Sequence, residues 1–391
     1  MGRFNIISFI TRTVRKVVML RTRAFPPEPR GLKEGKTLVK GGYDVHVIAW
    51  DRLSEFPKRE VIDGVSIRRV HIPSTYNDFM KFLVTLPLFW FFSLFSVLKR
   101  KPDVVHCADL DTMPVGLIAK KLIQCKLVFD AYEKYPEMVR DSISEAMFRF
   151  LDRVDKRCAK MADLVIVVWS SVLDRYPQSV EVPNLPEGRE FDKVTPEDRN
   201  RKRRELGIED KFVIGYVGIL MRGRGIEQVI QAVRGDPDAF FLIGGFGQEE
   251  DTIKNLTSQV KETMFIGFVK PQNVPSIICA CDAVVEILDP SNSNYRAAAG
   301  NKLFDALNAG LPFITAKGTV QGEFVQSLEC GVAVEYGNVE ELKKVIASLA
   351  KDRAIARSLG ERGKQAARER WNWEMTEGIL SEAYARLDNG K

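Results

Sequence analysis

Short apolar runs alternate with amphipathic helical patterns from one end of the chain to the other. This alternation constrains the fold more than any other feature of the sequence. In the first half, runs rich in Val, Ile, Leu and Phe occupy residues 16–20, 44–50, 65–71, 103–107, 126–130 and 163–168. The second half repeats the rhythm at residues 211–217, 239–243, 264–268, 283–288, 312–316 and 332–335. Because strands that alternate with helices build βαβ units, we expect an α/β fold with two doubly wound parallel sheets.

A polar linker separates the two halves. Residues 182–204 contain Pro183, Pro186 and Pro196 and end in four consecutive cations at 201–204, a composition typical of a domain boundary. Doubly wound sheets bind ligands at the carboxyl ends of their strands, and we expect the functional site there.

Composition excludes several classes of protein. A hydrophobic fraction of 45% and a charged fraction of 28% over 391 residues exclude a disordered, collagen-like or disulfide-framework chain. The net charge of +6 does not indicate nucleic acid, and it fits a phosphorylated substrate and an anionic membrane surface equally well. Six scattered cysteines and three dispersed histidines predict no metal site. With no secretory signal in view, we expect reduced thiols and a cytoplasmic protein.

Residues 82–98 are uncharged throughout and lie between Lys81 and the cations at 99–101. A spanning helix needs about 20 apolar residues; this segment is shorter and contains Pro87, which disfavours a span. Two interpretations stay open. The segment is either a core helix that covers a sheet or a helix that dips an aromatic face into a bilayer beside its basic flank.

The segment GNKLFDALNAGLP, residues 300–312, is the most informative motif. It predicts a helix with Asn301 as its N-cap. Lys302 and Asp305 are three residues apart and share a face of that helix. A helix start with a lysine favours a diphosphate, and a carboxylate one turn later can accept ribose hydroxyls. The alternative is a surface Lys–Asp pair of little energetic weight.

Two further glycine-rich turns follow predicted strands of the same half. GYVGILMRGRG, residues 215–225, lets the backbone approach a ligand closely, while Arg222 and Arg224 can neutralise phosphates. Residues 244–247 repeat the strand–glycine–helix pattern. Three such turns at the carboxyl end of one sheet indicate a ligand site.

The order of GYVGILMRGRG, LIGGFG, GFVKPQNVP and GNKLFDALNAGLPFITA resembles the nucleotide-sugar half of glycosyltransferase family 4, which has the GT-B fold. RAFPPEPRGLKEGKTLVKGGYDVHVIAW, PDVVHCADLDTMPVGLIAKKL and LVFDAYEKYPEM are similar to the family's first loop, acceptor-side loop and following strand. The resemblance implies two Rossmann-like domains facing a central cleft. The first covers 1–188 and is joined by the C-terminal helix 373–391, and the second covers 189–372. A simple terminal core helix is the alternative for the end of the chain.

The resemblance implies a retaining glycosyltransferase of the hexosyltransferase type, active in glycan biosynthesis. It would transfer a sugar from a nucleotide diphosphate sugar to an acceptor. No cofactor or metal is expected, because basic side chains and a helix N-terminus take the charge of the leaving diphosphate. A membrane or lipid-linked acceptor would fit peripheral contact of residues 79–101 with the inner face of the membrane; a soluble acceptor is the rival.

On the donor side, the resemblance places Arg224 and Lys302 at the diphosphate and Asp305 at the ribose. Gly218 and Gly245 would allow close approach, and the backbone at Phe268 and Val269 would border the nucleobase. The donor set implied is Gly218, Arg222, Arg224, Gly245, Phe268, Val269, Asn301, Lys302 and Asp305.

The chain departs from the family at three positions. A histidine is common where this chain has Ala108 and Tyr132, and a glutamate where it has Ala297, for which the loop 293–296 is a candidate replacement. The catalytic candidates are then His106, Asp109, Asp111 and Glu133, with Arg30, Tyr132, Asn294, Tyr295 and Arg296 on the sugar and acceptor side. An Asp after a strand is as often a helix cap. Two rivals therefore stay open: a catalytically impaired binding or regulatory protein, and a sugar-nucleotide epimerase or phosphorylase of the same fold.

Overall fold

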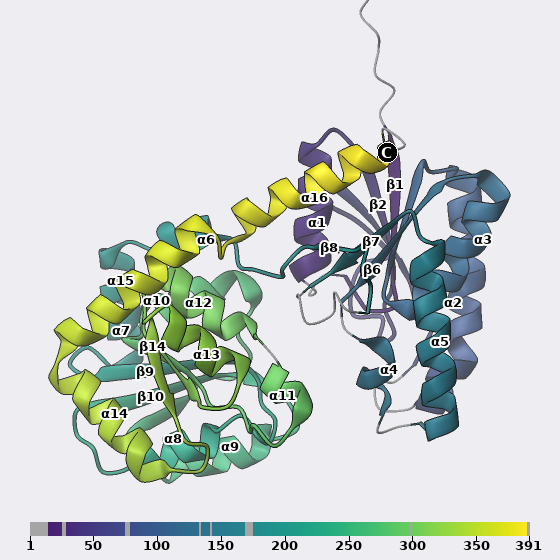
Figure 1. Cartoon of the computed structure of the whole chain (residues 1–391). Coiled ribbons are helices and arrows are strands. Elements are labelled where there is room, and N and C mark those ends of the chain that lie inside the picture. Colours follow the sequence, from purple (N-terminus) through teal and green to yellow (C-terminus); the bar gives the residue numbers. More distant parts are fainter. Residues whose placement is uncertain are drawn as a thin grey trace, which may run out of the picture. The chain divides into compact units, whose positions relative to one another are not determined.

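The computed structural model describes residues 15–25, 29–74, 79–132, 134–140, 143–168, 175–297 and 299–388 (Figure 1). The chain divides into two compact units, Met1–Pro183 with Glu377–Lys391, and Asn184–Thr376. The sequence predicted domain boundaries at 188 and 372.

The described ranges of the first unit form an eight-stranded sheet in the order β3-β4-β2-β1-β5-β6-β7-β8. Its strands are β1 (Lys16–Arg21), β2 (Asp44–Trp50), β3 (Arg59–Ile62), β4 (Val65–Val70), β5 (Val104–Ala108), β6 (Lys126–Ala131), β7 (Leu164–Val167) and β8 (Val180–Glu181). Its helices are α1 (Pro29–Lys40), α2 (Phe79–Arg100), α3 (Met113–Ile123), α4 (Tyr135–Met138), α5 (Glu145–Met161) and most of α16 (Trp373–Asp388). All pairs are parallel except β3 with β4. Helices cover both faces (Figure 1), which explains the almost unbroken apolar character of the central strands.

The second unit has a parallel sheet in the order β11-β10-β9-β12-β13-β14. Its strands are β9 (Phe212–Ile219), β10 (Ala239–Phe246), β11 (Thr263–Phe265), β12 (Ala283–Glu286), β13 (Phe313–Ala316) and β14 (Gly331–Val334). Its helices are α6 (Gly188–Asp192), α7 (Pro196–Leu206), α8 (Ile226–Val233), α9 (Glu250–Ser258), α10 (Val274–Cys279), α11 (Ser293–Ala297), α12 (Asn301–Ala309), α13 (Val320–Ser327), α14 (Val339–Lys351) and α15 (Arg353–Glu369).

Both sheets reverse their strand order at one point. In the first unit the reversal lies between β1 and β5, and in the second between β9 and β12. A crevice opens at such a reversal, outside the carboxyl ends of the two strands, and doubly wound folds bind ligands there. The two predicted Rossmann-like domains are therefore present, and each has a defined edge at which to look for a site.

Helix α2 is the segment for which two interpretations were left open, residues 82–98. One side packs on the sheet, where the Trp50 ring stacks on Phe82 and Phe89 with centroids 5.7 and 5.5 Å apart. The other side exposes large apolar side chains, which are 45–71% accessible: Val84, Leu88, Phe91, Phe92 and Phe95. Among the described residues, no helix is both long enough and apolar enough to cross a membrane.

Candidate active site

A buried carboxylate organises the strand-order reversal of the second unit. Glu286, the last residue of β12, is 1% exposed. Its Oε1 lies 2.7 Å from Lys302 Nζ of α12 and 2.6 Å from Arg224 Nη1 of the β9–α8 loop. Its Oε2 accepts a hydrogen bond from Gln321 Nε2 at 3.0 Å. Two cations that the sequence assigned to a diphosphate therefore converge on one acid.

Electrostatics stabilise the charged form of each member of this cluster. Burial opposes ionisation of Glu286, but Lys302 and Arg224 attract the carboxylate and hold its pKa below the ordinary value. Burial likewise opposes protonation of Lys302, yet the attraction of Glu286 raises the lysine pKa. The three groups carry one net positive charge at neutral pH, which suits an anionic ligand.

Two glycines of the predicted donor set are required by packing within the protein itself. A Cβ at Gly218 would lie 2.6 Å from Lys302 Cε and 2.7 Å from its Nζ. A Cβ at Gly245, whose φ is +147°, would lie 1.8 Å from the Gly218 carbonyl oxygen. Both positions exclude side chains, because the lysine stem and the neighbouring strand already occupy that space.

Of the other predicted donor-side and sugar-side residues, some lie beside the Glu286 cluster and some lie on the surface. Arg222 is largely exposed and its Nε lies 3.0 Å from Glu249 Oε1. The Arg224 guanidinium lies 5.4 Å from the centre of the Tyr295 ring, and the Tyr295 hydroxyl donates to the Arg222 carbonyl at 3.1 Å. Asn294 and Arg296 are exposed on the short helix α11. Arg224 and Tyr295 are therefore brought together, whereas Arg222 points to a different partner.

An aromatic pair lies at the carboxyl end of β10. The rings of Phe246 and Phe268 meet edge to face with centroids 5.4 Å apart, and both are more than half exposed. Val269 packs beside Gly244, where a Cβ would lie 2.7 Å from the valine Cγ2. Exposed aromatic rings at a ligand edge provide a face on which a base can stack.

Two expectations for α12 need correction. Gly300, not Asn301, is the N-cap residue, and Asn301 begins the helix as an exposed residue. A Cβ at position 300 would lie 3.1 Å from Glu286 Oε2, so the polar cluster leaves little room for a side chain at the cap. Nor do Lys302 and Asp305 form a surface pair: Lys302 is 7% exposed and bonds Glu286, while Asp305 is half-buried one turn later.

In the first unit, three strand ends bring acids and arginine together. Thr22, after β1, donates to Asp111 Oδ2 at 2.6 Å, and the Tyr132 amide donates to Asp109 Oδ1 at 3.2 Å. The Arg21 guanidinium lies 4.0 Å from the centre of the Tyr132 ring. Glu133, the fourth catalytic candidate, lies outside the described residues.

Asp109 is strained and electrostatically perturbed. Its φ is +63° with ψ at 167°, a conformation that residues with a Cβ rarely adopt. Burial raises the pKa of its carboxyl to about 7, although Arg21 opposes the shift. Burial also raises the pKa of Asp111, against its hydrogen bond from Thr22. Strain and a raised pKa at a strand-end edge are typical of functional carboxylates.

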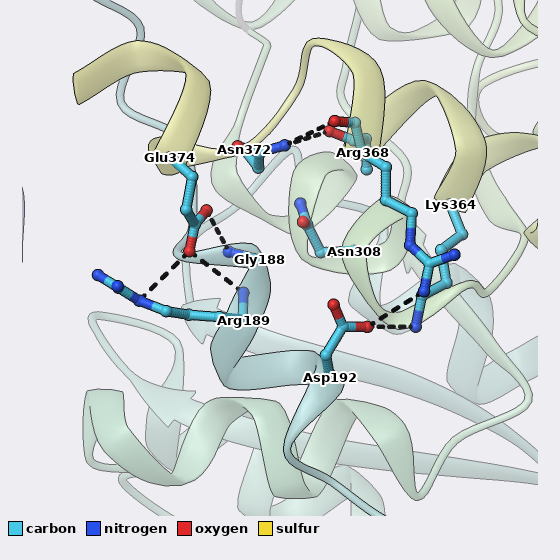
Figure 2. Close-up of a pocket in the computed structure, with 9 residues that line it drawn as sticks. Gly188, Arg189, Asp192, Asn308, Lys364, Arg368, Asn372 and Glu374 are labelled. Atoms are coloured by element: carbon cyan, nitrogen blue, oxygen red, sulfur yellow. Dashed lines mark hydrogen bonds and ion pairs between the residues drawn. The ribbon is translucent and has the colours of Figure 1, made fainter. Parts of the chain in front are cut away.

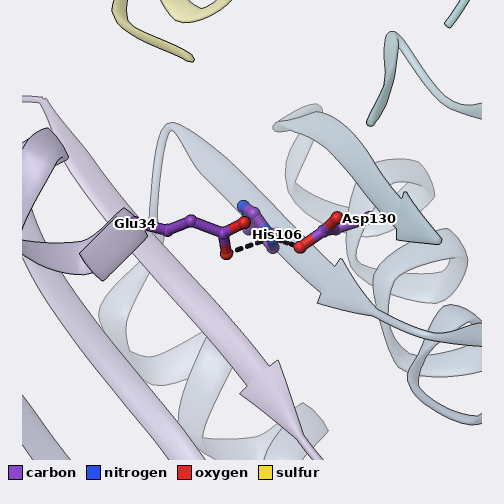
Figure 3. A group of neighbouring side chains, drawn as sticks. All are labelled: Glu34, His106 and Asp130. Atoms are coloured by element: carbon purple, nitrogen blue, oxygen red, sulfur yellow. Dashed lines mark hydrogen bonds and ion pairs between the residues drawn. The ribbon is translucent and has the colours of Figure 1, made fainter. Parts of the chain in front are cut away.

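His106 lies deeper, in the group that Figure 3 shows. Its Nε2 is 3.2 Å from Asp130 Oδ2 and 3.9 Å from Glu34 Oε2, and its Nδ1 is 2.7 Å from the Tyr384 hydroxyl. The side chain of His106 is fully buried because β5 is covered on both faces. The imidazole is therefore not open to solvent in this structure.

Arg30 completes this buried cluster. Its guanidinium contacts Glu34 Oε1 at 2.9 Å, Asp130 Oδ1 at 3.0 Å and the Val182 carbonyl at 2.6 Å. Arg30 is 1% exposed and so, like His106, does not form the acceptor-side surface that the sequence suggested. Ligand atoms of Glu34, His106 and Asp130 lie within 4.8 Å of one another, but the guanidinium already occupies the two carboxylates. The cluster therefore fits an ion-pair network better than a metal site.

Figure 2 shows a cavity of about 200 Å³ in the second unit, where α6 meets the end of α15 and the start of α16. Glu374 accepts hydrogen bonds from the amides of Gly188 and Arg189 at 3.0 and 3.3 Å. Asp192 bridges Lys364 at 2.9 Å and Arg368 at 3.6 Å. The lining groups bond one another, so this cavity is part of the packing of α6.

Glu286, Asp130 and Glu34 were not predicted from the sequence, although two of them left a signal in it. Glu286 and Asp130 interrupt the apolar runs AVVEIL and KLVFDA. An acid in a strand that is covered on both faces must have partners, and such an interruption marks a buried polar cluster. Glu34, on a helix of mixed polarity, carries no comparable signal.

Comparison with known proteins finds matches to both halves of the chain. The family model described as Glycosyl transferase 4-like domain matches residues 32–185, and Glycosyl transferases group 1 matches residues 198–366. A GDP-mannose-dependent monoacylated alpha-(1-6)-phosphatidylinositol monomannoside mannosyltransferase of Corynebacterium glutamicum is 25% identical over 53% of this chain and 56% of its own length. Spore coat protein SA of Bacillus subtilis is 25% identical over 47% of this chain and 51% of its length. The matched region thus spans about half the length of these curated relatives.

Solved structures match the fold over nearly the whole chain. Sucrose-phosphate synthase from Thermosynechococcus elongatus gives a TM-score of 0.76 at 19% identity, covering 96% of this chain and 100% of the other. Anabaena HepE in complex with UDP gives 0.71 at 17% identity, covering 95% and 99%. The two family models together match most of the chain, which therefore belongs to the glycosyltransferases of the family 4 type that its sequence resembles; the solved structures show that its two Rossmann-like domains have the GT-B fold.

Proposed function

We propose that the protein is a retaining glycosyltransferase that moves a sugar from a nucleotide diphosphate sugar to an acceptor hydroxyl. The observation that carries the proposal is the convergence of Lys302 and Arg224 on Glu286 at the strand-order reversal of the second unit. Two cations at this edge match the charge of a leaving diphosphate. Family membership supports the same chemistry.

The donor would be recognised in three parts. Lys302 and Arg224 would meet the diphosphate, together with the free amides at the start of α12. The Nε of Arg224 is buried and has no hydrogen-bond partner among the described residues, so it offers a donor to a phosphate oxygen. Phe246 and Phe268 would stack on the base, and Asp305 would accept the ribose hydroxyls. HepE binds UDP and UDP-glucose, and the Corynebacterium relative is named for GDP-mannose, so we propose a UDP- or GDP-linked sugar.

In the transfer, the bond between the anomeric carbon and the diphosphate oxygen breaks, and a bond from the acceptor oxygen to the same carbon forms. The proton of the acceptor hydroxyl passes to the departing diphosphate oxygen. The electron pair of the broken bond goes to the diphosphate, where Lys302 and Arg224 stabilise the new charge without a metal. On the acceptor side, Asp109 and Asp111 would accept hydrogen bonds from sugar hydroxyls. Because the pKa of Asp109 is about 7, this contact would strengthen as pH rises through neutrality.

We further propose a membrane or lipid-linked acceptor and peripheral contact with the inner face of the membrane. Support comes from the exposed apolar side of α2, with Phe91, Phe92 and Phe95, which lies next to the cations Lys99 and Arg100. Such a helix binds an anionic interface by burying its aromatic side chains at the headgroup level. A soluble acceptor is the alternative, and flotation with vesicles separates the two.

The test is incubation of the protein with a panel of UDP- and GDP-sugars while nucleotide release is measured. We expect release with one donor, and its loss in Lys302→Ala, with Glu249→Gln as a matched control that leaves it intact. The second candidate function is a binding protein without turnover. It is favoured by Tyr132, which lies under Arg21 and Arg30 where the family often has a histidine. Tight nucleotide binding with no release from any donor would establish that second function.

A further inference from the structure

A groove of about 660 Å³ opens in the first unit between the last turn of α2 and the edge of the sheet at β2, β4 and β3. Its inner wall carries hydroxyl and imidazole groups from His46, Ser66 and Ser96, which are half-buried or buried. Four exposed cations surround this wall: Arg59, Arg68, Lys99 and Arg100.

The four cations of the groove are not paired with acids among the described residues, whereas the imidazole of His46 lies 3.1 Å from Asp44 Oδ1. Of the four, Arg68 donates to the Ser96 hydroxyl at 3.1 Å. The acid that lines the groove, Glu60, is bonded at 2.6 Å to Arg69, a residue that lines no part of the groove.

Two of the four cations stabilise the fold where they lie, and the other two do not. Lys99 and Arg100 end α2 and favour its C-terminus through the helix dipole. Arg59 and Arg68, however, face each other across the antiparallel pair of β3 and β4, a position where like charges destabilise a sheet. An anion in the groove would remove that repulsion.

We propose that this groove is a second anion site of the protein, one that binds the phosphate group of a ligand. Guanidinium groups match phosphate oxygens in geometry and charge, and the hydroxyls of Ser66 and Ser96 add neutral donors. The volume is that of a site for a headgroup-sized or sugar-phosphate-sized molecule.

The groove is separate from the edge that carries Asp109. His46 is paired with Val18 near the amino ends of β2 and β1, whereas the predicted acceptor residues follow the carboxyl ends of these parallel strands. The ligand is therefore not the transferred sugar or its acceptor hydroxyl. The inference stands independently of the proposed function.

Two sources of phosphate have the right chemistry. Phe92 lies four residues before Ser96 on α2, and Phe95 lies four residues before Lys99, so the exposed aromatic side and the groove are neighbours. An anionic lipid could then place its phosphate in the groove while the rings enter the acyl boundary. A soluble phosphate ester would use the groove alone.

The test follows the imidazole resonances of His46 by NMR in the full chain. The chain has three histidines, at 46, 71 and 106, all in the first unit, so His46 can be compared with the other two. Burial, followed by the nearby Arg100, holds the His46 pKa below its ordinary value, while Asp44 opposes the shift and Lys16 adds to it. Titration with inorganic phosphate at constant ionic strength should shift the His46 resonances saturably and raise that pKa. His71, at the other end of the strand pair, is the internal reference and should not move.

The variant Arg59→Gln, Arg68→Gln should weaken phosphate binding by about tenfold or more, the loss expected for charge-assisted hydrogen bonds. Arg157→Gln, an exposed arginine on α5, is the matched control and should bind as the parent does. Unchanged His46 resonances, or equal shifts in the double variant and the parent, would overturn the proposal.

Vesicles identify the source of the phosphate. Sedimentation with phosphatidylcholine vesicles that contain phosphatidic acid, but not with phosphatidylcholine alone, and its loss in the double variant, would assign the groove to a lipid headgroup. Phosphate binding without sedimentation would assign it to a soluble phosphate ester.

Discussion

Replacing Glu286 by Gln tests the electrostatic organisation of the second unit most directly. The substitution keeps the shape of the side chain and removes the charge that Lys302 and Arg224 share. Arg224 is 19% accessible and can turn to water, whereas Lys302 is 9% accessible and cannot. Breaking a buried ion pair from one side costs about 3–5 kcal/mol. We expect the lower end, about 3 kcal/mol, because one cation can be solvated.

The measurement is thermal or urea unfolding of the second unit. For a unit of this size, about 3 kcal/mol lowers Tm by about 6–12 °C. The pKa of Glu286 is lowered in the folded protein, so its stabilisation is present above the unfolded pKa and is lost as pH falls through the folded pKa. Parent and variant should therefore differ most above about pH 4.5 and converge in acid. Glu249→Gln, which affects the more exposed pair with Arg222, should cost no more than about 1 kcal/mol.

A diphosphate should offset the loss of stability caused by Glu286→Gln. The variant carries one more positive charge at Lys302 and Arg224, and inorganic pyrophosphate should raise its Tm more than that of the parent, by mass action on the folded state. If Glu286→Gln is as stable as the parent at neutral pH and gains no more from pyrophosphate, the cations are not held by this acid and the reasoning is wrong.

Three further changes test other parts of the structure. Gly218→Ala should displace Lys302, because the new Cβ would lie 2.6 Å from its Cε; nucleotide affinity measured by calorimetry should fall while Gly235→Ala, a surface glycine, has no effect on it. Tyr384→Phe removes the hydroxyl bonded to His106 at 2.7 Å and should lower the free energy of unfolding by about 1–3 kcal/mol; equal urea midpoints would contradict that bond. Asp109→Asn removes a carboxyl whose pKa is raised to about 7 in the folded protein. The stabilisation by this carboxyl is full below the unfolded pKa and is lost as pH rises towards 7. The free energy of unfolding of the variant, relative to that of the parent, should therefore be higher at pH 8 than in acid. If the free energy of unfolding depends on pH in the same way in parent and variant, the pKa of Asp109 is not raised in the folded protein.

The pattern of apolar runs predicted the strands well. In the described part of the chain each of the twelve expected runs contains a strand, because strands covered on both faces must be apolar. Both edge strands of the first sheet, β3 and β8, were missed. The sequence of β3, Arg59–Ile62, is half polar, and β8 has only two residues. The Asp63–Gly64 pair, with φ of +50° and +83°, is a typical hairpin turn and could have indicated β3.

The candidate site could be predicted only in part. Lys302 and Arg224 could be predicted because each lies in a glycine-containing motif at the start of a helix, and the family resemblance assigned both to the diphosphate. Their partner Glu286 lies on a different strand, and local patterns carry no information about which side chains meet there. The contact of His106 with Tyr384 joins residues 278 positions apart and depends on tertiary packing alone.

The first unit is discontinuous in sequence, and this has a consequence for its synthesis. Leu380 and Tyr384 of α16 are fully buried in it, yet they are added after the whole of the second unit. The second unit is contiguous from Asn184 to Thr376 and can fold as soon as it leaves the ribosome. The unit that is made first therefore waits for its missing helix, with the polar cluster around His106 uncovered until α16 emerges.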